Sequence, residues 1–171
     1  LFSDQALETL RLLREDLRKV AGVDNVFTML DAPLLKSSDK SFTEMITDIP
    51  SLDKPDIDRG RAREELLNSP IYRELIISVD GRTTALLIEL AEDERCNSLR
   101  QSRSEMLAKR RDSGPTDEEA QALNRLEGEY IAARDGRSER RHLEVVQIRD
   151  ILEQYRAHSQ IYLGGVAMIT D

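Results

Sequence analysis

The sequence predicts an α+β fold, in which helices cover a mixed sheet and a long helical hairpin is inserted. The stretch RELIISVDGRTTALLIEL, residues 73–90, places two runs of β-forming residues around an Asp-Gly pair, which is typical of a tight β-hairpin. Helical periodicity precedes this stretch, and a much longer helical region follows it. The expected order is helix, strand, helix, strand, strand, helix, strand. One further strand in front would give a split βαβ, or ferredoxin-like, sheet.

The composition is that of one domain, or of one domain that carries an insertion. The chain has 171 residues, a net charge of −8, 34% charged residues and 39% hydrophobic residues. The acidic balance argues against general nucleic-acid binding, which favours a basic surface. No apolar run approaches the length of about 18 residues that a membrane span needs, and residues 1–10 lack the features of a signal peptide. A single cysteine excludes an internal disulfide.

A first helix is expected from a cap at Ser3 or Asp4 to about Ala21, with Gly22 ending it in the left-handed conformation. A strand from about Asn25 to Leu30 should follow. The apolar stripe of the helix consists of Leu7, Leu10, Leu13, Leu17 and Val20. Its solvent side is expected to hold Arg11, Arg14, Glu15, Arg18 and Lys19.

Residues 32–58 are rich in proline and serine and are predicted to form an irregular strap across the domain. Met45, Ile46 and Ile49 are its expected anchors. A connection of this length is usually functional or clamped to the fold. A short helix over residues 61–68 should come next, ended by Ser69-Pro70 because the residue before proline disfavours helix.

In the predicted β-hairpin, Asp80 and Gly81 form a type I′ turn in which both residues have positive φ. This register pairs residue 75 with 86, 77 with 84, and 79 with 82. A slip by one residue would turn the apolar side chains to the wrong face. The apolar face is expected to consist of Leu75, Ile77, Val79, Leu86, Ile88 and Leu90.

The region after the β-hairpin predicts a helical hairpin with arms of unequal length. The first arm covers residues 97–112 and the tip covers 113–115. Thr116 and Glu119 form a capping box that starts the second arm, which runs to about Ala157 over about 60 Å, with a bend expected at Gly136. A last strand is expected at residues 160–163. The predicted division is therefore an α/β part, residues 1–95 and 158–171, and an inserted hairpin, residues 96–157.

Four stretches together resemble one known family: residues 13–34 (LREDLRKVAGVDNVFTMLDAPL), 49–60 (IPSLDKPDIDRG), 62–90 and 161–168 (IYLGGVAM). They are similar to the extracytoplasmic porter segment of resistance-nodulation-division (RND) superfamily exporters, in the branch related to large mycobacterial membrane proteins and hopanoid transporters. The insertion, with DSGPTDEEAQALNRLEGEY at its tip, also looks like that of bacterial members. The motifs occur in family order, although none is diagnostic alone.

The resemblance implies a periplasmic part of a bacterial inner-membrane protein, between its first and second membrane helices. It implies proton-driven export of hydrophobic or amphiphilic, lipid-like molecules, in which this part guides substrate and relays conformational change without catalysis or cofactor. Its partners would be the membrane helices and second porter loop of the same parent chain. A homo-oligomer is expected on other grounds, because a missing first strand would leave a sheet edge exposed, and such edges invite pairing between copies. The family's energy-coupling acidic residues would lie in those membrane helices.

A cleft for such cargo is expected where flexible or bulky apolar side chains gather. The candidate residues are Met29, Phe42, Met45 and Ile46.

The polar candidates for a site carry weaker signals. Asp53, Asp56 and Asp58 lack the spacing of a calcium loop, and Asp58 is better explained as a helix cap. His142 and His158 are 16 residues apart, without partners at zinc spacing. Cys96 has no His nearby in sequence that would activate it, and Gly164-Gly165 is not part of a phosphate-binding loop.

Two other classes of function remain open. A free-standing interaction module would use the helical hairpin as a docking arm. Its first arm is basic and its second begins with an acidic run at residues 117–129, so these charges either face each other or meet a partner. An enzyme is disfavoured, because the sequence has no nucleophile–base pair, metal cluster or phosphate loop.

Overall fold

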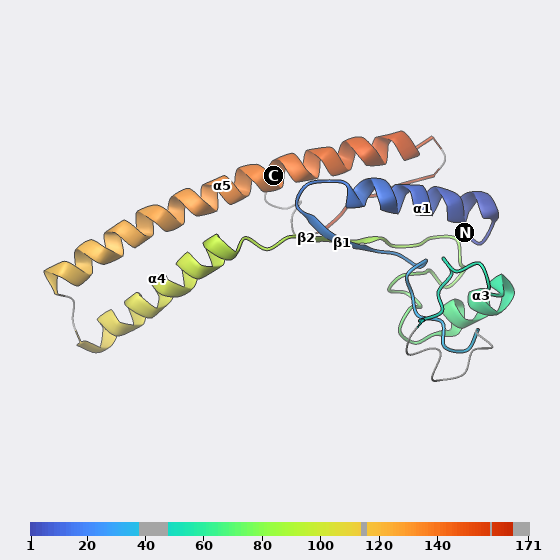
Figure 1. The fold of residues 1–171 in the computed structure, drawn as a ribbon, viewed down its shortest axis with the longest axis horizontal. Coiled ribbons are helices and arrows are strands. Elements are labelled where there is room, and N and C mark those ends of the chain that lie inside the picture. Colours follow the sequence, from blue (N-terminus) through green and yellow to red (C-terminus); the bar gives the residue numbers. More distant parts are fainter. Residues whose placement is uncertain (38–47, 114–115, 158, 166–171) are drawn as a thin grey trace. The chain divides into compact units, whose positions relative to one another are not determined.

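The computed structural model describes residues 1–37, 48–113, 116–157 and 159–165, and it confirms the α+β class (Figure 1). Strands β1 and β2 form an antiparallel sheet of two strands. No helix in these described residues is both long and apolar enough to span a membrane. In chain order the elements are α1 (Asp4–Arg18), β1 (Val23–Phe27), α3 (Arg59–Asn68), β2 (Leu87–Leu90), α4 (Glu94–Ser113) and α5 (Asp117–Tyr155).

The chain forms two compact units. The first consists of Leu1–Leu90 with Asp150–Ile161, and the second of Ala91–Arg149 with Tyr162–Asp171. The first unit contains α1, α3, the sheet and the end of α5, whereas the second contains α4 and most of α5. The core of the first unit joins residues of α1, of the turn after β1, of the strap, of α3 and of the segment before β2.

Helix α1 begins as predicted at Ser3, whose hydroxyl oxygen accepts a hydrogen bond from the backbone N–H of Ala6 (3.3 Å). Its predicted apolar stripe is buried. The helix ends at Arg18 rather than at Ala21, and Gly22 has a positive φ of 88° in the turn that leads to β1. The prediction that Arg14 faces solvent is wrong. Arg14 is 4% exposed, because two carboxylates replace the water that its guanidinium loses.

The sheet pairs β2 with β1 rather than with the run of residues just before the Asp-Gly turn. Val26 lies opposite Ile88 and Phe27 opposite Leu87, and a bulge falls between Val23 and Asn25. Val26 is fully buried, while Leu87 is exposed. Strand β1 therefore lies earlier than the predicted residues 25–30, because the chain turns at Thr28, whose N–H and hydroxyl both bond to Asp31.

The predicted β-hairpin has the correct register but not the predicted strands. An isolated bridge joins Ile77 and Thr84, and the N–H of Ser78 donates to the carbonyl of Thr83 (3.0 Å). Gly81 has a φ of 67°, whereas Asp80 does not have a positive φ, so the turn is not of type I′.

The arm before this turn is coiled rather than extended, which overturns the predicted apolar face. Leu75 and Val79 are 61% and 54% exposed, whereas Ile76 and Ile77 are both buried. An extended strand sends consecutive side chains to opposite faces, so burying both isoleucines in one core requires a bend. The bend is seen where the N–H groups of both residues donate to the carbonyl of Tyr72.

Helix α3 starts at Arg59, with Asp58 as its cap: the Asp58 carboxylate accepts from the N–H groups of Gly60 (2.8 Å) and Arg61 (3.0 Å). It ends at Asn68, just before Ser69-Pro70, as predicted. Of the predicted strap anchors, Met45 and Ile46 lie outside the described residues, and Ile49 is exposed. The described part of the strap is instead anchored by Leu52 and Ile57, which are buried in the core.

The second unit is a hairpin of two helices. The capping box at the start of α5 is confirmed: the N–H of Glu119 donates to the Thr116 hydroxyl (3.3 Å), and the N–H of Thr116 donates to the Glu119 carboxylate (3.0 Å). Helix α5 continues through Gly136 without interruption. At the other end of the chain, residues 160–163 do not form a strand, so that prediction is wrong.

Candidate functional site

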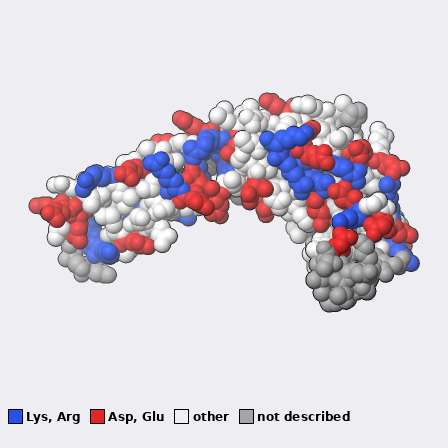
Figure 2. All heavy atoms as spheres, viewed as in Figure 1, with Lys and Arg blue, Asp and Glu red and all other residues white. Residues whose placement is uncertain are grey.

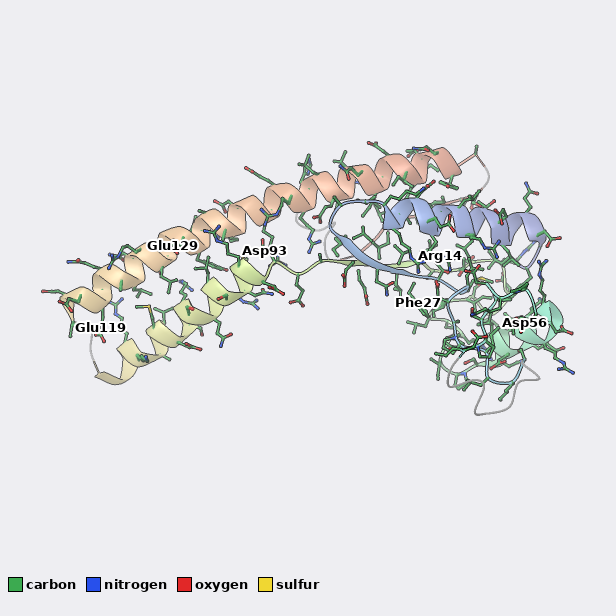
Figure 3. The ribbon with its side chains drawn as sticks, in the orientation of Figure 1. Arg14, Phe27, Asp56, Asp93, Glu119 and Glu129 are labelled. Atoms are coloured by element: carbon green, nitrogen blue, oxygen red, sulfur yellow. The ribbon has the colours of Figure 1, made fainter. Side chains whose placement is uncertain are left out.

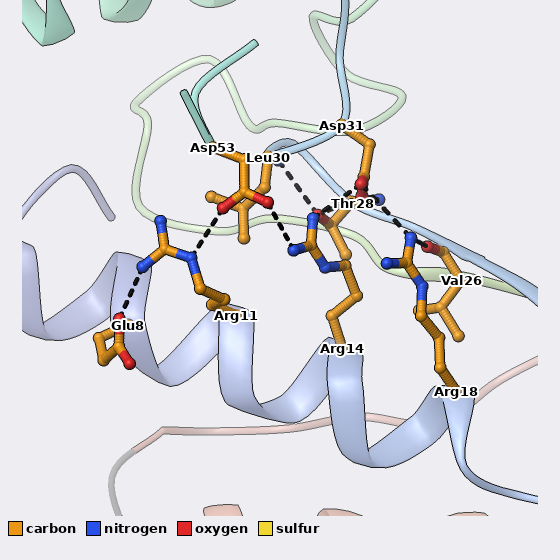
Figure 4. Close-up of polar contacts among 9 residues, drawn as sticks. All are labelled: Glu8, Arg11, Arg14, Arg18, Val26, Thr28, Leu30, Asp31 and Asp53. Carbon is orange, nitrogen blue, oxygen red and sulfur yellow. Dashed lines mark hydrogen bonds and ion pairs between the residues drawn. The ribbon is translucent and has the colours of Figure 1, made fainter. Parts of the chain in front are cut away.

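Three arginines on one face of α1 contact carboxylates from two separate loops (Figure 4). Arg11, Arg14 and Arg18 follow one another at steps of three and four residues, which places them on one helix face. Arg11 Nε and Arg14 Nη2 donate to the two oxygens of Asp53, each over 2.7 Å. Arg14 Nη1 donates to Asp31 Oδ1 over 2.7 Å. We call these three arginines and two aspartates the arginine ladder.

The turn after β1 fixes one end of the ladder. Asp31 Oδ2 accepts from the N–H (2.9 Å) and the hydroxyl (2.8 Å) of Thr28. Its other oxygen therefore points to Arg14. Arg18 binds to the end of β1, since its Nη2 donates to the carbonyl of Val26 (3.0 Å). The end of β1 is thus joined to α1 by side chains.

Arg14 is the most buried charged residue of the ladder, and its position is strongly determined. Its Nε is buried without a hydrogen-bond partner, and leaving such a group unpaired costs about 1–3 kcal/mol. The Arg14 side chain is 5% exposed, compared with 31% for Asp53. A buried arginine requires its carboxylate partners to remain in place, because removing one leaves uncompensated charge. The ladder therefore holds Asp53, and with it the strap, against α1.

The protonation equilibria agree with this geometry. Burial by itself would raise the pKa of Asp53, but the hydrogen bonds from Arg14 and Arg11 outweigh it and lower that pKa. The hydrogen bond to Asp53, followed by the one to Glu8, raises the pKa of Arg11. Both residues are therefore held in their charged forms at neutral pH.

The first part of the strap is held by a carboxylate of α3. Glu65 on α3 accepts from the N–H groups of Leu35 (2.8 Å) and Lys36 (2.9 Å) and from the hydroxyl of Ser37 (2.6 Å). The N–H of Leu34 also donates to the carbonyl of Pro50 (2.9 Å). Residues 34–37 and 50–53 are thus both tied to the core of the first unit.

The structure places one of the four predicted cleft residues. Met29 is fully buried in the core of the first unit, so it would line a cleft only if its covering residues moved away. Phe42, Met45 and Ile46 lie outside the described residues.

The three aspartates of LDKPDIDRG have different surroundings. Asp53 binds two arginines and Asp58 caps α3, while Asp56 lies in the strap just before α3 (Figure 3). Across the described residues, no group of three or more His, Cys, Asp or Glu side chains could hold a metal ion.

The remaining candidates are not brought together either. Cys96 is buried near the start of α4, where its N–H donates to Asp93 (2.8 Å). His142 is exposed on α5, and His158 lies outside the described residues. Gly165 has a positive φ of 135° in an irregular segment.

The ladder was missed by reasoning from sequence because arginine on an amphipathic helix usually faces solvent. The available signal was the i, i+3, i+7 spacing of three arginines, followed by aspartates in two irregular segments. The set contains acids and bases that already neutralise one another, and it has no nucleophile. Its chemistry is that of a clamp between α1, the end of β1 and the strap.

Comparison with known proteins adds no family or fold to this picture. No protein-family model, curated protein or solved structure matches the chain. The function therefore has to be argued from the residues and contacts of the chain itself.

Proposed function

We propose that this chain is the periplasmic porter segment of a proton-driven RND-type exporter in a bacterial inner membrane. It guides hydrophobic or amphiphilic molecules and relays conformational change, and it has no catalytic role. The proposal rests on the family resemblance of four ordered stretches, and one structural observation supports it. In the described residues, β2 pairs only with β1 and has no strand on its other side.

That free edge fits a split βαβ fold. An isolated two-stranded sheet is marginally stable in water, and its exposed edges invite further pairing. A strand preceding α1, and running parallel to β1, would fit beside β2 with the usual right-handed crossover through α1. In the family that strand follows the first membrane helix directly. We infer that β2 receives it in the parent protein.

The arginine ladder suits a part that moves as one body. Domain movement requires that small α/β units transmit displacement without deforming internally. Regular elements resist deformation through their own hydrogen bonds, whereas the strap depends on side chains. Asp53 and Glu65 provide such bonds for the strap, and Asp31 provides one for the turn just before it. We also propose that Met29, Phe42, Met45 and Ile46 contact the cargo. Met29 is fully buried, so the residues that cover it would have to move away.

The gene that surrounds this chain gives the first test. We expect an apolar run of about 20 residues within some tens of residues upstream, and another soon downstream. A stop codon directly after Asp171, with no apolar run upstream, would refute the proposal and leave the free-standing module. The compactness of the second unit favours that module as the second candidate.

Labelling of the full-length protein in intact cells gives the second test. Glu118 is exposed on α5, whereas the single native Cys96 is buried. A Glu118→Cys variant of a full-length protein that keeps no cysteine outside this chain should react with a membrane-impermeant maleimide added outside the inner membrane, and the same protein without the substitution should react slowly. Labelling only after the inner membrane is opened would overturn the periplasmic placement.

A transport assay addresses the role itself. In the full-length protein, Asp53→Asn should reduce export of an amphiphilic fluorescent dye at unchanged membrane abundance, while Asp24→Asn on the exposed side of β1 should not. Equal export by both variants would contradict a mechanical role for the ladder.

A further inference from the structure

Acidic side chains lie over both units of the chain (Figure 2), and two exposed aspartates are each followed by glycine. Asp80-Gly81 lies in the turn of the first unit, and Asp135-Gly136 lies within α5 of the second. An aspartate in this position can rearrange spontaneously, through attack of the following main-chain nitrogen on its side chain. Glycine favours the attack, because it has no Cβ to shield that nitrogen.

The rearrangement needs only water as a co-reactant. The Gly81 nitrogen attacks Cγ of the protonated Asp80 carboxyl group, a C–N bond forms, and the amide proton and the carboxyl hydroxyl leave together as water. Another water molecule then opens the cyclic imide at either of its carbonyl carbons. Opening at the side-chain carbonyl restores aspartate. Opening at the main-chain carbonyl gives isoaspartate, in which the main chain runs through the side-chain carbon atoms.

The helix prevents this reaction at Asp135. Helix α5 is continuous from Asp117 to Tyr155, so the Gly136 N–H donates to a carbonyl one turn earlier. Ring closure requires a backbone angle ψ at the aspartate that lies outside the helical range. The Asp135 carboxylate also accepts a hydrogen bond from Arg134 Nη2 (2.9 Å). Asp135 therefore stays intact while α5 is folded.

The turn at Asp80 is held by hydrogen bonds to both reacting groups. Asp80 Oδ1 accepts from the Ser78 hydroxyl (2.6 Å) and from the N–H of Arg82 (3.0 Å). The Gly81 N–H donates to the Ser78 carbonyl (2.9 Å). The hydrogen bond from Ser78, followed by that from Arg82, also lowers the pKa of Asp80, whereas the attack requires the protonated carboxyl group. Ser78 thus restrains both the nucleophile and its target.

The packing of Gly81 restrains the same turn. Gly81 is buried, with a φ of 67°, and a Cβ atom at this position would lie 3.3 Å from Leu67 Cδ2 and 3.9 Å from Phe2 Cε2. Isoaspartate would lengthen the main chain directly before this residue. The turn could then not keep both this packing and the hydrogen bond from the Ser78 N–H to the Thr83 carbonyl (3.0 Å). The modified turn should therefore detach from α3.

We propose that Asp80-Gly81 is the site at which the folded chain forms isoaspartate, at a rate set by Ser78 and by the packing of Gly81 on Leu67. The reaction follows local opening of the turn, because an exposed turn opens at a lower free-energy cost than the core. Asp80 reacts once these contacts are broken, whereas Asp135 requires α5 to unwind. This modification is spontaneous, and it is independent of the proposed exporter role.

Ageing of the purified chain at neutral pH and physiological temperature tests this site. Cleavage after glutamate gives peptides 75–89 and 130–139, in which chromatography and electron-transfer fragmentation locate isoaspartate. In the folded wild type, isoaspartate should accumulate in peptide 75–89 and not in peptide 130–139. Ser78→Ala should accumulate it about fivefold faster, because losing a hydrogen bond raises the population of the open turn. Ser78→Thr keeps the hydroxyl and should match the wild type.

A matched control and a second variant keep the result specific. Ser102→Ala, at an exposed serine of α4, should age like the wild type. Leu67→Ala leaves the hydrogen bonds of Asp80 in place and removes the packing of Gly81, so it should also accelerate the reaction. Circular dichroism checks the fold of each variant, and Leu67→Ala decides the outcome if Ser78→Ala does not fold.

Unfolding in urea gives the reference rate. It removes the protection at both aspartates, so isoaspartate should then form at similar rates in the two peptides. Equal rates at Asp80 in the folded chain and in urea, or isoaspartate first at Asp135, would overturn the proposal. It is also overturned if peptide 75–89 of the folded wild type stays unmodified, or if neither Ser78→Ala nor Leu67→Ala accelerates the reaction.

Discussion

Removing the Asp53 carboxylate should release the strap from α1, and the structure sets the size of the effect. Asp53→Ala deletes two hydrogen bonds to charged groups, from Arg11 and Arg14, both 2.7 Å long. Such bonds contribute about 1.5–3 kcal/mol each when buried. The value here is smaller, because the Asp53 side chain is 31% exposed and each arginine keeps another carboxylate. We expect the free energy of unfolding to fall by about 2 kcal/mol.

Urea denaturation of Asp53→Ala, Arg14→Met and the double variant measures this effect. Arg14→Met should cost about 3 kcal/mol, because it leaves two carboxylates facing a buried apolar side chain. The double variant should lose less than the sum of the single losses, by about 1 kcal/mol, since the residues share one contact. Asp24→Ala, at an exposed aspartate of β1, is the matched control and should change stability by less than about 0.5 kcal/mol.

Hydrogen exchange locates the change. Amide protection in residues 50–54 should fall in Asp53→Ala, while protection in α3 should be retained. If Asp53→Ala is as stable as Asp24→Ala, or if the single losses add without coupling, the ladder does not hold the strap and the reasoning is refuted.

Four further outcomes follow from the contacts. Hydrogen bonds from Arg14 and Arg11 outweigh burial and lower the pKa of Asp53 in the folded state. The charged Asp53 therefore stabilises the fold above the unfolded-state pKa of about 3.9, and this contribution is lost as the pH falls through the lower folded-state pKa. Asp53→Asn should accordingly flatten the acid limb of a stability–pH curve. Asp58→Ala should cost about 1 kcal/mol in thermal or urea unfolding, because two N–H groups of α3 lose their cap. Leu66→Ala should cost about 2–5 kcal/mol, since this leucine is fully buried in the core. Burial and the hydrogen bond to Asp16 raise the pKa of Tyr155 to about 12, so Tyr155→Phe should remove the latest tyrosine step of an ultraviolet titration.

The elements that sequence predicted correctly are those whose signals are local. The Ser3 and Asp58 caps, the leucine stripe of α1 and the Thr116–Glu119 box each depend on residues within one or two turns. Their hydrogen bonds or periodicity determine the backbone wherever the segment packs. The helical hairpin was predictable for the same reason.

The errors arose where distant contacts decided the structure. Residues 73–79 have high β propensity, but burying Ile76 and Ile77 in one core required a bend that propensity does not encode. β2 therefore pairs with β1, a partner some 60 residues earlier in the chain. Arg14 was assigned to solvent because its two partners come from loops whose positions no local pattern gives. The ladder is thus a tertiary feature, visible in sequence only as an arginine spacing.

The ladder also explains why a charged residue occupies the inner side of α1. An apolar residue at position 14 would pack against the strap without fixing its position along the helix. Asp53 bridges Arg11 and Arg14 and so accepts only one register of the strap on α1. Buried ion pairs contribute modest net stability compared with apolar replacements, but here they specify a unique placement for a segment without regular structure. In the proposed exporter role, the part needs that placement more than it needs extra stability, because a strap that slipped along α1 would absorb the displacement that the part is proposed to transmit.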